Sequence, residues 1–248
     1  MPQEFEIRRE VAVEATPEQV WQAIADGPGI DSWFMGRTEL EPGVGGKVRQ
    51  TFPGGFTEEA EITAWQPGSR LAYRGAPSPE GAFMAFEYLV EGRGSGTTVV
   101  RLVHSGFLGD DWESEYEALE IGDLQYLRKL ATYVRYFGGR HSTHNLFLVH
   151  PEVGAAAFRS EIGRVLGLAG EARAGDEVTV AVEGLEPEPG VVEWTDAGGG
   201  CVGVRTGDAL YLFFHAQGNA VVERHVYVPA DGAAVERAWQ GWLDRAFA

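Results

Sequence analysis

The sequence predicts an α+β protein in which a curved antiparallel sheet wraps around one long helix. Three observations predict it. The stretch 113–137 has apolar residues at helical spacing, short alternating stretches precede it, and glycine-rich segments separate those stretches. A shorter series of similar elements follows at 145–248. We therefore expect a second, smaller α+β unit of similar type after the first.

The stretch 113–137 predicts a helix that is apolar on two sides. Its apolar residues fall into two rows at helical spacing. The first row is Leu119, Tyr126, Leu130, Tyr133 and Phe137, and the second is Ile121, Leu124, Leu127 and Val134. Such a helix needs a wide apolar surface to pack on. We predict that the preceding sheet grips this helix and that a ligand-sized space remains between them.

Residues 5–105 predict the sheet. Apolar residues alternate with charged ones from Phe5 to Val13, which indicates a half-buried strand. Thr16 is expected to cap a helix that begins at Pro17 and that the GPG at 27–29 ends, with a short helical turn at 30–36 after it. Five more strands are predicted at 47–52, 57–65, 69–75, 82–90 and 97–105, with PGVGG, PGG, QPGS and GRGSG as turns. The prediction is a six-stranded antiparallel meander.

The second half repeats this order in shortened form. The small, polar stretch 138–144 is a predicted linker, so the predicted domains are 1–140 and 145–248. A strand is expected at 145–149, a helix opened by Pro151 and Glu152, five strands, and a closing helix at 231–248. GTTVVRLVH at 96–104 corresponds in position to GNAVVERHV at 218–226. We interpret the second unit as a degenerate copy of the first, and the alternative is a single α+β domain with an extension.

The composition excludes several classes of partner. The formal charge is −17 at pH 7, so neither nucleic acid nor an anionic membrane is expected to bind. No stretch reaches the roughly 18 to 20 apolar residues that a membrane span needs, and the charged N-terminus is unlike a secretory signal. We therefore expect no membrane insertion and a cytoplasmic location. The single cysteine, Cys201, excludes an internal disulfide, and no cofactor or metal is expected.

Enzyme sequence motifs such as G-x-x-x-x-G-K-[ST], H-E-x-x-H and G-x-S-x-G do not occur in the sequence. His141, His144 and His150 form an H-x-x-H-x5-H pattern, but a polar linker rarely supplies the rigid geometry that a metal needs. His104 on the strand 97–105 is the better candidate for acid–base chemistry. The sequence places no carboxylate to orient it and no nucleophile beside it.

Five motifs of the first half resemble the START-like SRPBCC superfamily, and within it the branch named after the activator of heat-shock protein 90 ATPase. They are Pro17 with Val20 and Trp21, Trp33-Phe34, Gly45-Gly46, Pro67 with Leu71, and His104-Ser105-Gly106-Phe107. The resemblance covers roughly residues 5–137 and implies a helix-grip (START/Bet v-like) fold. The branch's tryptophan-glycine pair is replaced here by Glu120-Ile121-Gly122-Asp123, whereas Trp239-Gln240-Gly241 in the second half resembles it.

Strand alternation predicts which side chains face the long helix. Arg101, Glu87 and Arg74 are expected to face solvent, so their neighbours in sequence face inward. With the helix and the turn at 30–36, the predicted ligand-binding residues are Trp33, Phe34, Tyr73, Met84, Phe86, Tyr88, Leu102, His104, Tyr126, Leu130 and Tyr133. Apolar walls with a few polar groups suit a small hydrophobic ligand. The same set is also what a filled core would contain.

Three functions follow from these expectations. The first is non-enzymatic binding of a small hydrophobic or aromatic ligand between the sheet and the long helix. The second, which the resemblance implies, is a co-chaperone-like interaction module, and it leaves a protein partner or a homodimer open. The third, also implied by the resemblance, is a polyketide cyclase/aromatase-like enzyme with His104 as acid or base. The absence of a catalytic constellation favours the first function over an enzyme.

Overall fold

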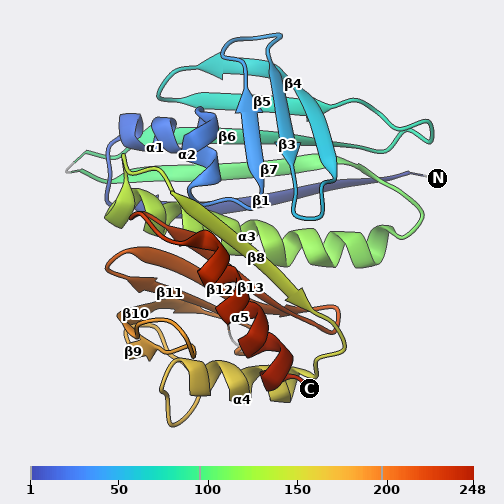
Figure 1. Cartoon of the computed structure of the whole chain (residues 1–248). Coiled ribbons are helices and arrows are strands. Elements are labelled where there is room, and N and C mark those ends of the chain that lie inside the picture. The colour runs from blue at the N-terminus through green and yellow to red at the C-terminus, as the bar shows by residue number, and fades with distance from the viewer. Residues whose placement is uncertain (1, 95, 197) are drawn as a thin grey trace. The chain divides into compact units, whose positions relative to one another are not determined.

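The chain folds as two units, Met1–His141 and Ser142–Ala248 (Figure 1). The computed structural model describes residues 2–94, 96–196 and 198–248. Each unit combines one antiparallel sheet with helices, so the α+β class predicted from the sequence is confirmed. The division falls inside the stretch 138–144 that was predicted as a linker.

The first unit has the helix-grip fold, with the strand order β1-β7-β6-β5-β4-β3-β2. Its strands are β1 (Gln3–Val13), β2 (Arg37–Leu40), β3 (Lys47–Thr51), β4 (Thr57–Gln66), β5 (Arg70–Gly75), β6 (Phe83–Gly92) and β7 (Thr98–Leu108). The prediction of six strands was wrong by one, because β2 is a short edge strand. Its four residues include one apolar side chain, Leu40, and the buried position is a threonine, Thr38, so no alternation of apolar and polar residues marks it in the sequence. Of the predicted turn at 92–96, Ser95 lies outside the described residues.

Two short helices connect β1 to β2. The helix α1 (Pro17–Ile24) begins with a capping box, in which the Thr16 side chain accepts from the Gln19 N–H and the Gln19 side chain accepts from the Thr16 N–H. The second helix, α2 (Gly27–Asp31), starts where the sequence predicted an end to the first. Asp26 caps it and proline occupies its first turn, a position where the missing N–H of proline costs nothing.

The long helix α3 (Trp112–Phe137) packs against β1 and β7. Its second half is buried at Leu127, Leu130, Tyr133, Val134 and Phe137. Its first half buries fewer side chains, and Ile121, predicted for the second apolar row, is 49% exposed. The packing of α3 in the first unit is therefore close at its Phe137 end and less close at its Trp112 end.

The second unit has the same connectivity with one strand fewer. Its elements are β8 (His144–His150), α4 (Ala155–Val165), β9 (Glu177–Val180), β10 (Glu188–Thr195), β11 (Cys201–Thr206), β12 (Ala209–Ala216), β13 (Asn219–Val226) and α5 (Gly232–Ala246). The sheet order is β8-β13-β12-β11-β10-β9, so the first strand again pairs with the last. Pro151 and Glu152 do not open α4, because Glu152 has a φ of 59° and the helix starts at Ala155.

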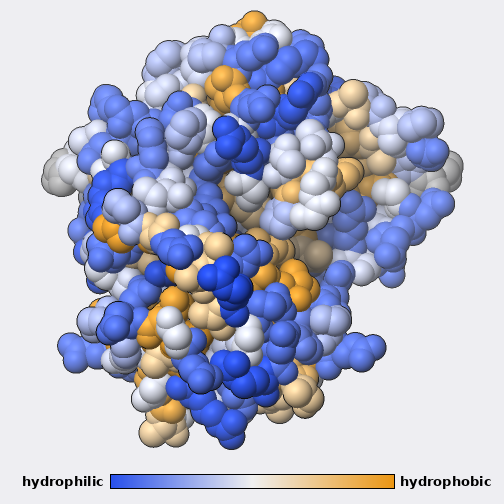
Figure 2. Space-filling view, viewed as in Figure 1, coloured by the Kyte–Doolittle hydropathy of each residue, from blue (hydrophilic) through white to orange (hydrophobic). Residues whose placement is uncertain are grey.

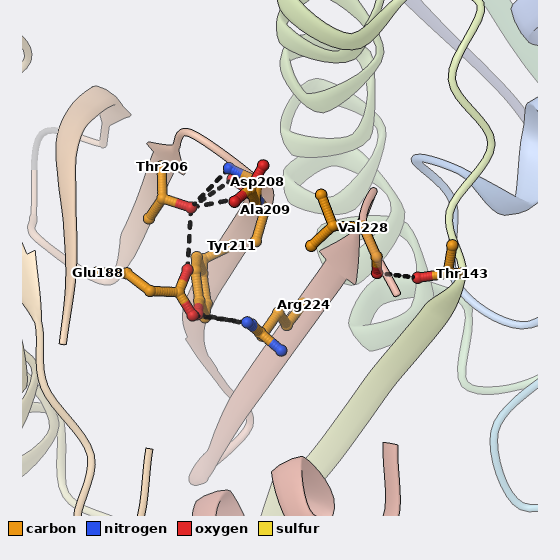
Figure 3. A network of polar contacts seen from close by, with 8 residues as sticks. All are labelled: Thr143, Glu188, Thr206, Asp208, Ala209, Tyr211, Arg224 and Val228. Carbon is orange, nitrogen blue, oxygen red and sulfur yellow. Dashed lines mark hydrogen bonds and ion pairs between the residues drawn. The ribbon is translucent and has the colours of Figure 1, made fainter. Parts of the chain in front are cut away.

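Aromatic rings fill the interior of the second unit. Trp239 of α5 is fully buried and contacts both Tyr211 and Phe213, with ring centroids 5.7 Å apart in each case. Beside these rings, Thr206, Tyr211 and Arg224 all donate hydrogen bonds to the carboxylate of Glu188, at 2.6 to 2.9 Å (Figure 3). Glu188 thus serves as a shared acceptor for three side chains of this sheet.

Hydrophilic residues cover most of the face seen in Figure 2, with hydrophobic residues interspersed in small groups. This agrees with a sequence that carries 37 acidic and 20 basic side chains. Over the described residues, no helix combines the length and the hydropathy of a membrane span.

Candidate functional site

A cavity of about 360 Å³ lies in the first unit between the sheet and the first half of α3. Residues from α1, α2 and the segment after it, from β3 to β7 with the β3–β4 connection, and from α3 line it. They are Ile24, Ile30, Trp33, Phe34, Met35, Gln50, Phe52, Phe56, Glu58, Tyr73, Met84, Phe86, Tyr88, Leu102, His104, Ala118, Leu119, Gly122, Asp123 and Tyr126. A second space of about 360 Å³ adjoins it, since the two share Gln50, Glu58, Tyr73, Met84 and Phe86.

The structure brings nine of the eleven predicted ligand-binding residues to this cavity: Trp33, Phe34, Tyr73, Met84, Phe86, Tyr88, Leu102, His104 and Tyr126. It does not bring Leu130 and Tyr133 there. Both are buried one and two turns further along α3, where the grip on the helix is tight. Tyr133 is held by its own hydrogen bond, which its hydroxyl donates to the Arg140 carbonyl at 2.9 Å.

His104 and Asp123 form a buried pair in the wall of the cavity. The Nδ1 atom of His104 lies 3.0 Å from Oδ2 and 3.2 Å from Oδ1 of Asp123. Because a carboxylate only accepts, Nδ1 carries the hydrogen, and in the neutral ring Nε2 is left as an acceptor. This Nε2 is buried and has no hydrogen-bond partner among the described residues.

The expectation that no carboxylate orients His104 was therefore wrong. Asp123 follows Leu119 by four residues and precedes Tyr126 by three, so helical spacing alone places it on the face that contacts the sheet. The sequence signal was present, but only apolar residues were used to define that face. The imidazole is further fixed by Phe86, whose ring stacks on it with centroids 4.0 Å apart, and by Phe5, edge-on at 5.1 Å.

Tyr73 and Tyr88 contribute two hydroxyl groups that hydrogen-bond to each other. Burial raises the pKa of both hydroxyls well above the ordinary value of 10, and the negative charge of Asp123 adds to the effect. Both groups are therefore protonated at neutral pH and supply hydrogen-bonding groups to the cavity wall without a charge.

A connected set of aromatic rings forms part of the cavity wall. Phe34 contacts Tyr126 of α3 at 4.6 Å between centroids, Trp33 at 5.6 Å and Phe52 at 6.4 Å. Phe52 in turn stacks with Phe56 at 6.1 Å. The Trp33 indole N–H is already used, since it donates to the Ala23 carbonyl at 2.8 Å. These rings therefore offer flat apolar contact area rather than hydrogen bonds.

Glu58 stands at the edge shared by the two spaces and keeps an exposed surface. Partial burial raises the pKa of its carboxyl group, with His104 opposing the shift and the Glu115 carboxylate adding to it. Glu58 was not among the predicted site residues. It shares a strand face with the buried Ile62 of β4, so strand alternation was the signal that could have identified it.

The histidines of the linker pattern are not brought together at a metal-binding group. His144 and His150 lie at opposite ends of β8, and His141 lies 3.7 Å from the Asp26 carboxylate. Across the residues that the structure describes, no group of three or more His, Cys, Asp or Glu side chains has the arrangement of a metal site.

Several solved structures are similar to this chain. Protein MLL2253 from Mesorhizobium loti is 22% identical and aligns over 52% of this chain and 95% of its own, with a TM-score of 0.46. The Aha1 dimer from Colwellia psychrerythraea is 22% identical over 54% of this chain and 99% of its own, with a TM-score of 0.44. The di-domain ARO/CYC BexL from the BE-7585A biosynthetic pathway is 14% identical over 98% of both chains, with a TM-score of 0.49.

No curated protein matches the chain. Residues 4–125 match the model of the family described as polyketide cyclase / dehydrase and lipid transport. This match is confined to the first unit and ends inside α3, next to the cavity residues Asp123 and Tyr126.

Proposed function

We propose that the first unit binds a small hydrophobic or aromatic ligand in the cavity between its sheet and α3. The observation that carries this proposal is the cavity itself, whose size of about 360 Å³ lies within the range of small-molecule sites and whose walls are mainly apolar. The family match over residues 4–125, whose description includes lipid transport, agrees with this function.

The polar atoms in the wall support a ligand with at least one hydrogen-bonding group. A buried acceptor without a partner costs about 1–3 kcal/mol, and Nε2 of His104 is such an atom. A hydroxyl or an amine on the ligand would donate to it. The neighbouring Tyr73 and Tyr88 hydroxyls add further polar groups on the same wall.

A neutral fluorescent probe tests the binding function. N-phenyl-1-naphthylamine should bind with a rise in fluorescence and a stoichiometry of one. Gly122→Leu should abolish this rise, because a Cβ at Gly122 meets no atom within 4 Å and a longer side chain enters the cavity. The matched control is Gly163→Ala in α4 of the second unit, which should bind like the wild type. Equal binding by Gly122→Leu and the wild type would refute the site.

The pair of His104 and Asp123 favours a second function, acid–base chemistry on the bound ligand of the polyketide cyclase/aromatase type. Asp123 fixes the tautomer that leaves Nε2 able to take a proton from a carbon acid, and a positioned base of this kind contributes about 10²–10⁴-fold. With a poly-β-ketone substrate, His104→Ala should abolish turnover, and Asp123→Asn should lower kcat more than it changes KM. Unchanged turnover in His104→Ala would exclude this function and leave the binding function intact.

A further inference from the structure

The charged groups that line the cavity are acidic. Glu58 and Asp123 both contribute to its wall, and no lysine or arginine is among the described residues that line it. The imidazole of His104 already contacts the Asp123 carboxylate through Nδ1. The wall therefore has no cation to neutralise the carboxylate, phosphate or sulfonate group of a ligand.

Two basic residues that contact α3 or belong to it, Arg9 and Lys129, are not among the lining residues either. Arg9 on β1 pairs with Glu120 at 3.0 Å, on the side of α3 away from the lining residues. Lys129 lies with its Nζ 5.4 Å from the ring centroid of Tyr126 and is not a lining residue. An anion in the cavity would lose its hydration without gaining an ion pair, which is costly.

Glu58 is placed where a ligand's charged end would emerge. It belongs to both adjoining spaces and retains solvent exposure, whereas Asp123 is 9% exposed. Glu115 lines the second space and adds its negative charge near Glu58. A cation at this edge would keep part of its hydration and still contact a carboxylate, which makes the site favourable for an ammonium group.

Two aromatic rings of the cavity lining favour a cation as well. Phe52 and Phe56 stack on each other in the cavity lining, and Phe56 is 63% exposed. A ring face attracts an ammonium group within about 6 Å of its centroid. An exposed phenylalanine next to a carboxylate thus provides both parts of a site for an organic cation.

We propose that the cavity selects hydrophobic, aromatic ligands that carry a basic nitrogen, with the protonated amine at Glu58 and the apolar body between the sheet and α3. The inference rests on the proposed binding function and specifies its ligand class. Neutral analogues bind more weakly, and carboxylates are rejected by Glu58 and Asp123.

Three nearly isosteric probes test this selectivity on the full chain: 1-naphthylmethylamine, 1-naphthalenemethanol and 1-naphthoate, titrated by calorimetry at pH 7. The amine should bind about tenfold more tightly than the alcohol, as expected for one partly solvated ion pair, and the carboxylate should bind at least tenfold more weakly than the alcohol. Glu58→Gln should lower the affinity of the amine about tenfold and change that of the alcohol by a much smaller factor. Glu61→Gln, which makes the same charge change on the same strand outside the lining, is the control.

The outcomes separate this inference from the function on which it rests. Binding of the alcohol or the carboxylate as tightly as the amine, or an equal loss for all three probes in Glu58→Gln, would overturn the charge selectivity and leave a general apolar site. No binding by any of the three would overturn the proposed function together with the inference.

Discussion

Replacing Gly122 with leucine should stabilise the protein and block the cavity at the same time. Gly122 lies in the interior of α3 and lines the cavity, and a Cβ added to it meets no atom within 4 Å. Core substitutions from small to large normally cost free energy because they overpack the interior. Here the added atoms enter space that is already empty.

The size of the effect has two parts. Glycine in a helix interior costs about 1 kcal/mol relative to alanine, so Gly122→Ala should raise the free energy of unfolding by about that amount. Gly122→Leu adds the burial of an apolar side chain, about 1.5–3 kcal/mol, less about 0.5–1 kcal/mol of lost rotamer entropy. The expected total for leucine is about 1.5–3.5 kcal/mol. Ligand affinity should be little changed in the alanine variant and lost in the leucine variant.

Urea unfolding of the full chain, followed by tryptophan fluorescence, measures the free energy of unfolding of Gly122→Ala and of Gly122→Leu. Gly163→Ala in α4 is the control, because its Cβ meets other atoms only at 3.6 Å or more and Gly163 does not line the cavity of the first unit. It should show the helix-propensity gain alone. If Gly122→Leu is less stable than Gly122→Ala by more than about 1 kcal/mol, the space beside Gly122 is not empty in solution and the cavity is refuted.

Three other changes have defined outcomes. Asp123→Ala leaves Nδ1 of His104 buried without a partner and should cost about 1–3 kcal/mol by urea unfolding; a neutral effect would mean that the pair is not formed. Burial raises the pKa of Asp31 from 3.8 to about 6, so the folded state binds this proton more tightly than the unfolded state. The free energy of unfolding should therefore fall as pH rises from about 4 to about 6, by about 1–3 kcal/mol, and Asp31→Asn should remove this fall; an unchanged pH profile would contradict the assignment. Glu188→Ala leaves the guanidinium of Arg224, 7% exposed, without its carboxylate and should cost about 3–5 kcal/mol, whereas a cost below 1 kcal/mol would show that the pair is not formed in solution (Figure 3).

Periodicity was enough to predict the framework of the first unit. Alternation on β6 and β7 placed Phe86 and His104 on the face toward α3, because side chains two apart share a face whatever the rest of the chain does. The spacing from Leu119 to Phe137 likewise identified α3. These signals are local, so a single sequence contains them in full.

The features that escaped prediction depend on distant parts of the chain. Periodicity gives the face of a helix but not how far along it a cavity extends, so Leu130 and Tyr133 were expected at a site that ends near Tyr126. Whether the interior contains a cavity depends on the volumes of side chains from several strands together, so no short stretch of sequence predicts it. Glu58 shares a strand face with the buried Ile62 of β4, so its direction was predictable locally, but the two spaces that it borders are formed by several strands together.

The central claim is that the space between the sheet and α3 holds a ligand. Intermolecular nuclear Overhauser effects between bound 1-naphthylmethylamine and the methyl groups of Met84 and Leu102, both lining residues, measure this directly. The structure predicts strong effects to both residues in the wild type and none in Gly122→Leu. Effects confined to exposed methyl groups such as those of Val44, which is 71% exposed, would contradict the claim.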